Sequence, residues 1–128
     1  MFLGAYSNMA WSVLFHDDFA GEFESLSEAV KEELVAQAKV LEAFGPALGR
    51  PRVDTLKGSK HANMKELRFD ADNGVWRVAF AFDPKREAML LVAGDKSGTG
   101  EKRFYRELIR KADKRFTEHL ASLEKTRK

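Results

Sequence analysis

A chain of 128 residues, 44% of them hydrophobic, is long enough for one domain with one core, and its net charge of +2 excludes neither acidic nor basic partners. The chain contains no cysteine, which excludes disulfides, cysteine zinc sites and cysteine nucleophiles and fits a reducing compartment. No apolar run approaches the ~20 residues of a membrane-spanning helix, so we expect a cytoplasmic protein without a membrane partner.

The predicted elements begin after an N-terminal tail. Residues 1–10 lack the basic and apolar regions of a signal peptide and are expected to be disordered, with either Met1 or Met9 as the start. The short apolar run that follows is rich in β-formers and predicts a first strand over residues 11–15. Residues 17–24 fit a separate short helix.

A longer helix is predicted over residues 25–44. Ser25 and Glu28 match the S-x-x-E capping box, apolar residues recur at helical spacing, and Gly45-Pro46 ends the helix. The helix is acidic, so we expect its polar face to contact solvent or basic segments of a partner.

Residues 63–94 are predicted to form three antiparallel strands. The first two strands alternate between apolar and polar residues, and the third is a continuous apolar run. Asn73-Gly74 predicts a tight hairpin turn between the first two strands, and residues 83–87 predict another turn before the third.

Alternation along these strands separates the side chains into two sets. On the second strand the side chains expected under the helices are Trp76, Val78, Phe80 and Phe82. Arg77 then points the other way, among Ala79 and Ala81, onto a shallow open surface. Glu66 and Arg68 of the preceding strand are expected on the same side. These three charged side chains form either a cross-strand ion pair that covers the sheet or a surface that binds phosphates.

The last helix begins at residue 101 and carries apolar residues four apart, from Phe104 to Leu120. Residues 123–128 are expected to be a frayed basic tail. The predicted order is β-α-α-β-β-β-α. It describes an α+β fold in which helices pack on one face of a small, mainly antiparallel sheet, within a single domain over residues 11–122.

Charge is distributed unevenly along this order. Residues 1–49 contain two lysines and eight acidic residues, a net charge of −6, so the rest of the chain carries +8. The asymmetry favours two faces with different partners, one of them acidic or a nucleic acid. The alternative is that acidic helices and basic strands simply alternate.

Few of the usual catalytic or metal-binding motifs are present. The three histidines His16, His61 and His119 form no H-x-x-x-H pattern, so neither a metal nor a cofactor is predicted. The glycine-rich residues 94–102 do not match a P-loop, although they lead into a helix N-terminus where amides and Lys96 would suit a phosphate. A flexible connector explains that segment equally well. Any chemistry therefore depends on cations with one acid or a phenol.

An ordered set of short motifs resembles a known family. It comprises "LKG" at residues 56–58, "ELR" at 66–68, "GVWRV" at 74–78, a third strand that ends in a basic loop, and the helix "RFYRELIRKADKRF". This set is similar to the RelE/ParE toxin superfamily and most resembles its HigB-like, phage Gp49-like branch. The resemblance implies a toxin of a type II toxin–antitoxin module, whose partner is a helix-turn-helix antitoxin.

The resemblance also implies an activity and residues that carry it. Such toxins cleave mRNA on the ribosome without a metal, through attack of the ribose 2′-OH on a phosphate that cations stabilise. The implied catalytic residues are Arg77, Arg68, Glu66, Lys96 and Tyr105. Tyr105 lies close to the position at which the family carries a tyrosine that can act as a base. The implied RNA-binding residues are Lys57, Lys60, His61, Lys65, Lys102 and Arg103. Met64 and Glu66 occupy positions where RelE carries lysines.

Two alternatives stay open. The first alternative to the nuclease is a RelE/ParE-fold protein without nuclease activity, which binds a protein target such as gyrase or binds its antitoxin alone. The chain also fits an unrelated RNA- or DNA-binding α+β module, for which stable binding to naked RNA and no toxicity are expected.

Overall fold

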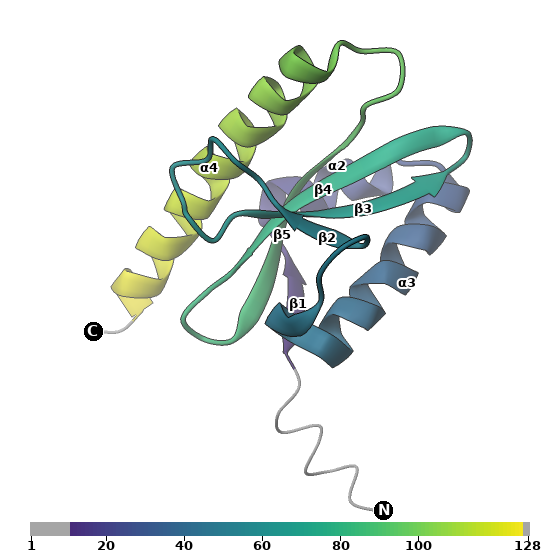
Figure 1. The fold of residues 1–128 in the computed structure, drawn as a ribbon. Helices are drawn as coiled ribbons and strands as arrows, with labels where there is room; N and C mark the ends of the chain where they lie inside the picture. The colour runs from purple at the N-terminus through teal and green to yellow at the C-terminus, as the bar shows by residue number, and fades with distance from the viewer. Residues whose placement is uncertain (1–10, 127–128) are drawn as a thin grey trace, which may run out of the picture.

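The structure is a computed structural model and describes residues 11–126; the predicted N-terminal tail lies outside the described residues. Its elements in chain order are β1 (Ser12–Phe15), α2 (Asp17–Glu24), α3 (Glu28–Phe44), the 3₁₀ helix η1 (Gly45–Ala47), β2 (Val53–Thr55), β3 (Lys65–Ala71), β4 (Gly74–Phe82), β5 (Glu87–Asp95) and α4 (Glu101–Thr126). The α+β class is confirmed, and so is the predicted order apart from one further strand, β2 (Figure 1). Helix α4 extends beyond the predicted limit at residue 122.

All five strands form one sheet in the order β1-β5-β4-β3-β2. The first strand, β1, pairs in parallel with β5, and every other neighbouring pair is antiparallel. Strand β5 lies between β1 and β4 and is apolar on both faces, which explains why its sequence does not alternate. The sequence did not predict β2, because three residues are too few to show alternation.

The short helix α2 is separate from α3, and this changes the predicted cap. Ser27 is the N-cap of α3, and its hydroxyl accepts a hydrogen bond from the Val30 amide at 3.3 Å. Ser25 instead ends α2, where its amide donates to the Glu22 carbonyl. The predicted capping box at Ser25 was therefore wrong. Ser25 and Ser27 are both suitable N-cap residues for α3, but Ser25 forms the C-terminal end of α2.

The β3–β4 hairpin turns one residue earlier than predicted. Asp72 and Asn73 are the two central residues, with φ of 51° and 62°, and Gly74 pairs with Ala71 as the first residue of β4. Asp and Asn tolerate the left-handed conformation that this turn requires. Gly74 is needed for space, because a Cβ there would lie 2.7 Å from an Asp95 carboxylate oxygen.

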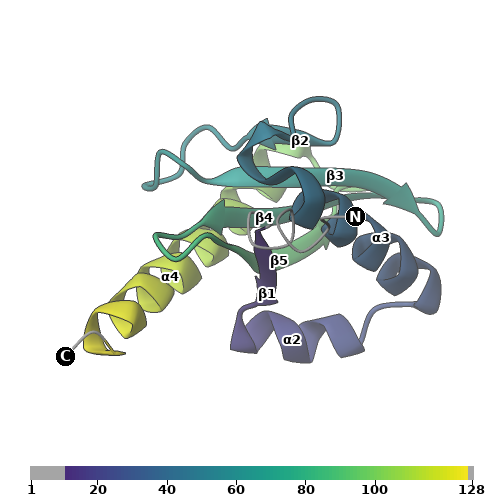
Figure 2. The same ribbon diagram turned by 90° about the horizontal axis from the view of Figure 1, so that it is seen from below.

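Helices cover both faces of the sheet, which corrects the prediction of a single covered face (Figures 1 and 2). The α3-face core is formed by Phe19, Val30, Leu34, Leu41, Val53, Leu67, Phe69, Val78, Phe80, Ala88 and Leu90. The α4-face core is formed by Leu56, Met64, Ala79, Ala81, Met89, Leu91, Val92, Phe104, Leu108, Ala112 and Phe116. Alternation assigns the strand residues to one core or the other, except at the bulge of β5, where the adjacent residues Leu91 and Val92 both lie in the α4-face core.

The surface of alanines predicted to be open is buried. Ala79 and Ala81 are fully covered, and they lie in the α4-face core with Phe104 and Phe116. Small strand residues leave the space that the large side chains of α4 fill. None of the helices within residues 11–126 is long and apolar enough to cross a membrane.

This packing makes a prediction at Ala79. An Ala79→Leu substitution adds volume to a filled core and should lower the free energy of unfolding by about 1–3 kcal/mol, measured by urea denaturation. Ala36→Leu makes the same change at an exposed position of α3 and should alter stability little. An unchanged midpoint for Ala79→Leu would show that α4 does not cover this part of β4.

Candidate functional site

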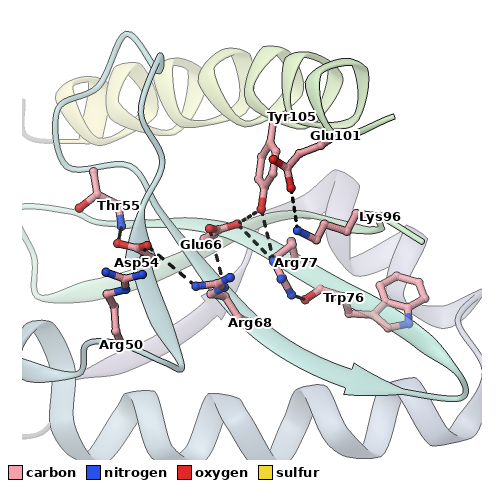
Figure 3. A network of polar contacts seen from close by, with 10 residues as sticks. All are labelled: Arg50, Asp54, Thr55, Glu66, Arg68, Trp76, Arg77, Lys96, Glu101 and Tyr105. Atoms are coloured by element: carbon pink, nitrogen blue, oxygen red, sulfur yellow. Dashed lines mark hydrogen bonds and ion pairs between the residues drawn. The ribbon is translucent and has the colours of Figure 1, made fainter. Parts of the chain in front are cut away.

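The candidate site is a groove on the α4 face of the sheet, between the N-terminal part of α4 and strands β2 and β3. Its volume is about 450 Å³. The residues that line it are Arg50, Asp54, Thr55, Leu56, Lys57, Glu66, Arg68, Lys96, Glu101 and Tyr105. Figure 3 shows Tyr105 extending from α4 toward the charged side chains of β3 and β4.

Strand geometry brings the central charges together. Glu66 and Arg68 are two residues apart on β3 and therefore share a face, and Arg68 lies opposite Arg77 of β4 in the antiparallel register. On the far side of Arg77 the register partner in β5 is Gly94. A Cβ at Gly94 would lie 2.8 Å from the Phe104 ring, so glycine permits the close approach of α4.

The centre of the site is a contact of three residues, which we call the Glu66–Tyr105–Arg77 cluster. The Tyr105 hydroxyl donates to Glu66 Oε1 at 2.8 Å and accepts from Arg77 Nε at 3.3 Å, and Arg77 Nε lies 3.6 Å from the same carboxylate oxygen. Arg77 also donates to the Trp76 carbonyl at 2.9 Å. The side chains of Arg77 and Glu66 are 7% and 8% exposed, so both are held in place.

The phenol in this cluster keeps its proton at neutral pH. Burial raises the pKa of the Tyr105 hydroxyl above its ordinary value, and the hydrogen bond to Glu66 raises it further, while Arg77 opposes both effects. Tyr105 is therefore a proton donor in the free protein, whereas the family resemblance implied a base.

Around the centre, three of the four cations that line the groove lie near an acid. Arg68 is 3.9 Å from Asp54 and 4.0 Å from Glu66, and Arg50 Nε is 3.5 Å from the same Asp54 oxygen. On the opposite wall, Lys96 Nζ lies 3.1 Å from Glu101 Oε1. Four lining cations and three lining acids leave the groove with a net charge of +1.

The position of Lys96 is set by the turn after β5. The Lys96 amide donates to the Val75 carbonyl at 2.8 Å, while the Asp95 carboxylate accepts from the amides of Val75 and Ser97. The ammonium group of Lys96 then lies 5.7 Å from the centre of the Tyr105 ring. The glycine-rich segment is thus ordered where it meets the site.

All five predicted catalytic residues meet at this site: Glu66, Arg68 and Arg77 on the strands, Lys96 after β5, and Tyr105 on α4. Arg77, predicted on an open surface, is instead buried. It reaches a second, smaller hollow of about 260 Å³ that is lined by Pro51, Arg68, Phe69, Asp70 and Arg77. Arg68 lines both hollows.

Of the six predicted RNA-binding residues, Lys57 lines the groove and the others lie elsewhere. Lys65 faces the α3 side, because it is adjacent to Glu66 on β3 and neighbouring side chains of a strand point to opposite faces. His61 packs on the Phe116 ring and bonds to Thr117, and the amide of Lys60 donates to Asp113. Lys102 is exposed in the first turn of α4, and Arg103 lines a separate pocket against β5.

The sequence missed three charged residues that line the groove: Arg50, Asp54 and Glu101. Arg50 precedes the unpredicted strand β2 and Asp54 lies within it, in a segment where the sequence predicted neither a helix nor a strand. Glu101 is the first residue of α4, where an acid is explained by the helix dipole alone. No local pattern therefore indicated that these side chains face Arg68 and Lys96.

Among the residues that the structure describes, two groups of possible metal ligands lie outside the groove. They are His16, Asp18 and Glu118, and Asp83, Glu87 and His119, and in each group the ligand atoms lie within 4.8 Å of one another. Spacing along the chain did not indicate them, since their members come from different elements. In the second group His119 Nε2 lies 2.7 Å from Asp83, and the Lys85 and Glu87 amides donate to Asp83, so this group ties the β4–β5 turn to α4.

The architecture is that of the RelE-like toxins. The solved structure of E. coli toxin RelE, a double arginine-to-alanine mutant in the free state, matches with a TM-score of 0.52 and 14% sequence identity. The match covers 80% of this chain and 96% of that chain. At this level of identity, the similarity establishes the fold.

Sequence comparison then identifies the family. The family Phage derived protein Gp49-like matches residues 21–117. The candidate toxins HigB2 and HigB3 of Mycobacterium tuberculosis are 48% and 44% identical over 103 and 100 residues, or 80% and 78% of this chain. The alignments cover 51% of HigB2 and 85% of HigB3, so the chain spans about half the length of HigB2. The protein belongs to the Gp49-like family, in the HigB-like branch of the RelE/ParE superfamily that the sequence motifs predicted.

Proposed function

We propose that the protein is the toxin of a type II toxin–antitoxin module and inhibits translation as a ribosome-dependent mRNA endoribonuclease. Its membership of the HigB-like family and its RelE-like fold support the toxin assignment. The observation that carries the nuclease assignment is the Glu66–Tyr105–Arg77 cluster, with Arg68 beside it at the edge of an open groove. The partners are a helix-turn-helix antitoxin and mRNA on the ribosome.

The cluster contains the groups that RNA cleavage needs. The ribose 2′-oxygen attacks the adjacent phosphorus, and the bond between this phosphorus and the 5′-oxygen of the next nucleotide breaks. The products are a 2′,3′-cyclic phosphate and a 5′-hydroxyl. Glu66 takes the proton of the 2′-OH, and Tyr105 gives its proton to the leaving oxygen. The hydrogen bond between Tyr105 and Glu66 then returns the proton to the phenol.

The arginines stabilise the charge that develops in this reaction. A pentavalent phosphate spreads negative charge over its oxygens, and guanidinium groups offer fixed pairs of N–H donors that match such oxygens. Arg77 is held by Tyr105 and the Trp76 carbonyl, and Arg68 faces both hollows. No metal ion takes part in the proposed reaction.

A specific observation favours a second candidate, a RelE/ParE-fold toxin without nuclease activity. Of the two positions where RelE carries lysines, Met64 is fully buried in the α4-face core and Glu66 places an acid beside Arg77 and Arg68. Such a protein acts on a protein target such as gyrase, or binds its antitoxin alone.

Transcript mapping after induced expression tests these functions against each other. Discrete cuts within codons, accompanied by growth arrest, support the nuclease. Growth arrest with intact transcripts and damaged DNA supports the second candidate. Normal growth in cells that lack an antitoxin contradicts a toxin of either kind.

The proton-donor role makes a prediction at Tyr105. Tyr105→Phe should lower the cleavage rate by about 10²-fold or more, because the leaving oxygen loses its proton donor. The ring still packs against Phe104, so the fold should be retained. Ser122→Ala removes an exposed hydroxyl from the same helix and should leave the rate unchanged. Equal rates for Tyr105→Phe and the parent chain would remove Tyr105 from the reaction.

A further inference from the structure

We propose that Asp54 and Glu101 are specificity-determining residues, whose carboxylates occupy the places of RNA phosphates in the free protein. They compete with free RNA for the cations of the groove, so that the protein favours RNA held on the ribosome. This inference rests on the proposed function and concerns the same site. Glu66 has a role in the proposed reaction, whereas these two acids have none.

Asp54 lies where an acid is unfavourable for the sheet itself. It is the register partner of Glu66 across β2 and β3, and like charges directly opposite each other destabilise a strand pair. Arg68 offsets this repulsion, since its guanidinium lies 3.9 Å from Asp54 and 4.0 Å from Glu66. Asp54 also lies 3.5 Å from Arg50. One carboxylate thus stands between two arginines, as a phosphate would.

The ion pairs of Asp54 are loose enough to be exchanged. Their separations of 3.5 to 3.9 Å are longer than a charge-assisted hydrogen bond. The side chains of Arg68 and Asp54 are 29% and 37% exposed, so solvent reaches the pair and weakens it. A phosphate that accepts two N–H groups from Arg68 therefore replaces a poorer partner.

Glu101 repeats this arrangement on the opposite wall. Its carboxylate lies 3.1 Å from Lys96 Nζ. Glu101 is the first residue of α4, and the N-terminus of a helix attracts anions. The glycine-rich segment and Lys96 were predicted to suit a phosphate, and an internal carboxylate holds that position. Figure 3 shows the two acids on either side of the Glu66–Tyr105–Arg77 cluster.

The consequence is a penalty on RNA binding that depends on how the RNA is presented. Each phosphate must displace a carboxylate that remains nearby and repels it. A ribosome that holds the mRNA beside a docked toxin supplies a high effective concentration and compensates for this cost. RNA free in solution has no such compensation and should bind weakly.

Binding to an uncleavable RNA tests the inference. Fluorescence anisotropy would measure the Kd of a single-stranded 2′-O-methyl RNA for the full chain at low salt. Asp54→Asn and Glu101→Gln should each tighten binding by about three- to tenfold, a gain that shrinks as salt rises. The Asp54→Asn substitution should not disturb β2, because the side-chain amide oxygen can still accept from the Thr55 amide.

Glu107→Gln is the matched control. Glu107 also lies on α4 and pairs with an arginine, Arg110 at 2.9 Å, but it does not line the groove. Its removal changes the net charge equally and should alter the Kd less than about twofold. Equal tightening by the control would overturn the inference, as would weaker, unchanged or undetectable binding by Asp54→Asn.

Cleavage is scored separately in a translation reaction and on free RNA. Tighter binding by the two variants without any cleavage leaves the inference standing and contradicts the nuclease. Ribosome-dependent cleavage with no change in Kd supports the nuclease and contradicts the inference about Asp54 and Glu101. When both hold, Asp54→Asn should also cleave free RNA faster than the parent chain does.

Discussion

Arg77→Ala is expected to abolish transcript cleavage and relieve growth arrest. Removal of one donor that stabilises a transition-state anion lowers rates by about 10²–10³-fold, and Arg77 also orients Tyr105 through its Nε. The measurement is the rate of mRNA cleavage in a translation reaction with purified ribosomes, together with growth after induction. Arg110→Ala removes an exposed arginine of α4 that pairs with Glu107 and should leave both unchanged.

Arg77 is buried, so its substitution needs a control for folding. Arg77→Lys keeps the positive charge but lacks the Nε and Nη pair, so it should fold well and still lose most of the cleavage. Circular dichroism and urea denaturation would establish that the variants are folded. Full cleavage by a folded Arg77→Ala protein would exclude the proposed site. If Arg77→Ala does not fold, the cleavage rate of the folded Arg77→Lys variant tests the role of Arg77 instead.

Phe116→Ala is expected to have the largest effect on stability. The side chain is 1% exposed in the α4-face core, and replacement of a buried phenylalanine by alanine costs about 3–5 kcal/mol. Urea denaturation would measure the change in free energy of unfolding. Phe44→Ala makes the same change at a side chain that is 61% exposed, and should shift stability by no more than about 0.5 kcal/mol.

The same substitution tests how the segment between β2 and β3 is attached. His61 packs edge-on against the Phe116 ring at 5.0 Å, and Asp113 of the same helix accepts from the Ser59 hydroxyl and the Lys60 amide. Loss of the ring should therefore raise amide hydrogen exchange in this segment before α3 is affected. Similar losses of stability for Phe116→Ala and Phe44→Ala would contradict the packing of α4 on this face.

Periodicity was sufficient for the elements and for part of the site. The four-residue spacing from Phe104 to Leu120 predicted α4, and a period of two placed Glu66, Arg68 and Arg77 on one side of the sheet, as the structure has them. These inferences depend on backbone geometry alone, because a helix and a strand each impose their own repeat on the side chains. Turn and cap positions were less well predicted, since neighbouring residues such as Ser25 and Ser27 suit the same role.

The sequence by itself thus determined the order of elements apart from β2, the residues that share a face of β3 and β4 around the site, and the family. Only the tertiary structure decided that α4 covers the face carrying Ala79 and Arg77, because an apolar helix stripe does not say which side of a sheet it will meet. The same placement brought Tyr105 to Glu66 and buried Arg77. It also set Asp54 and Glu101 beside the groove cations, through contacts between segments far apart in the chain that no local pattern records.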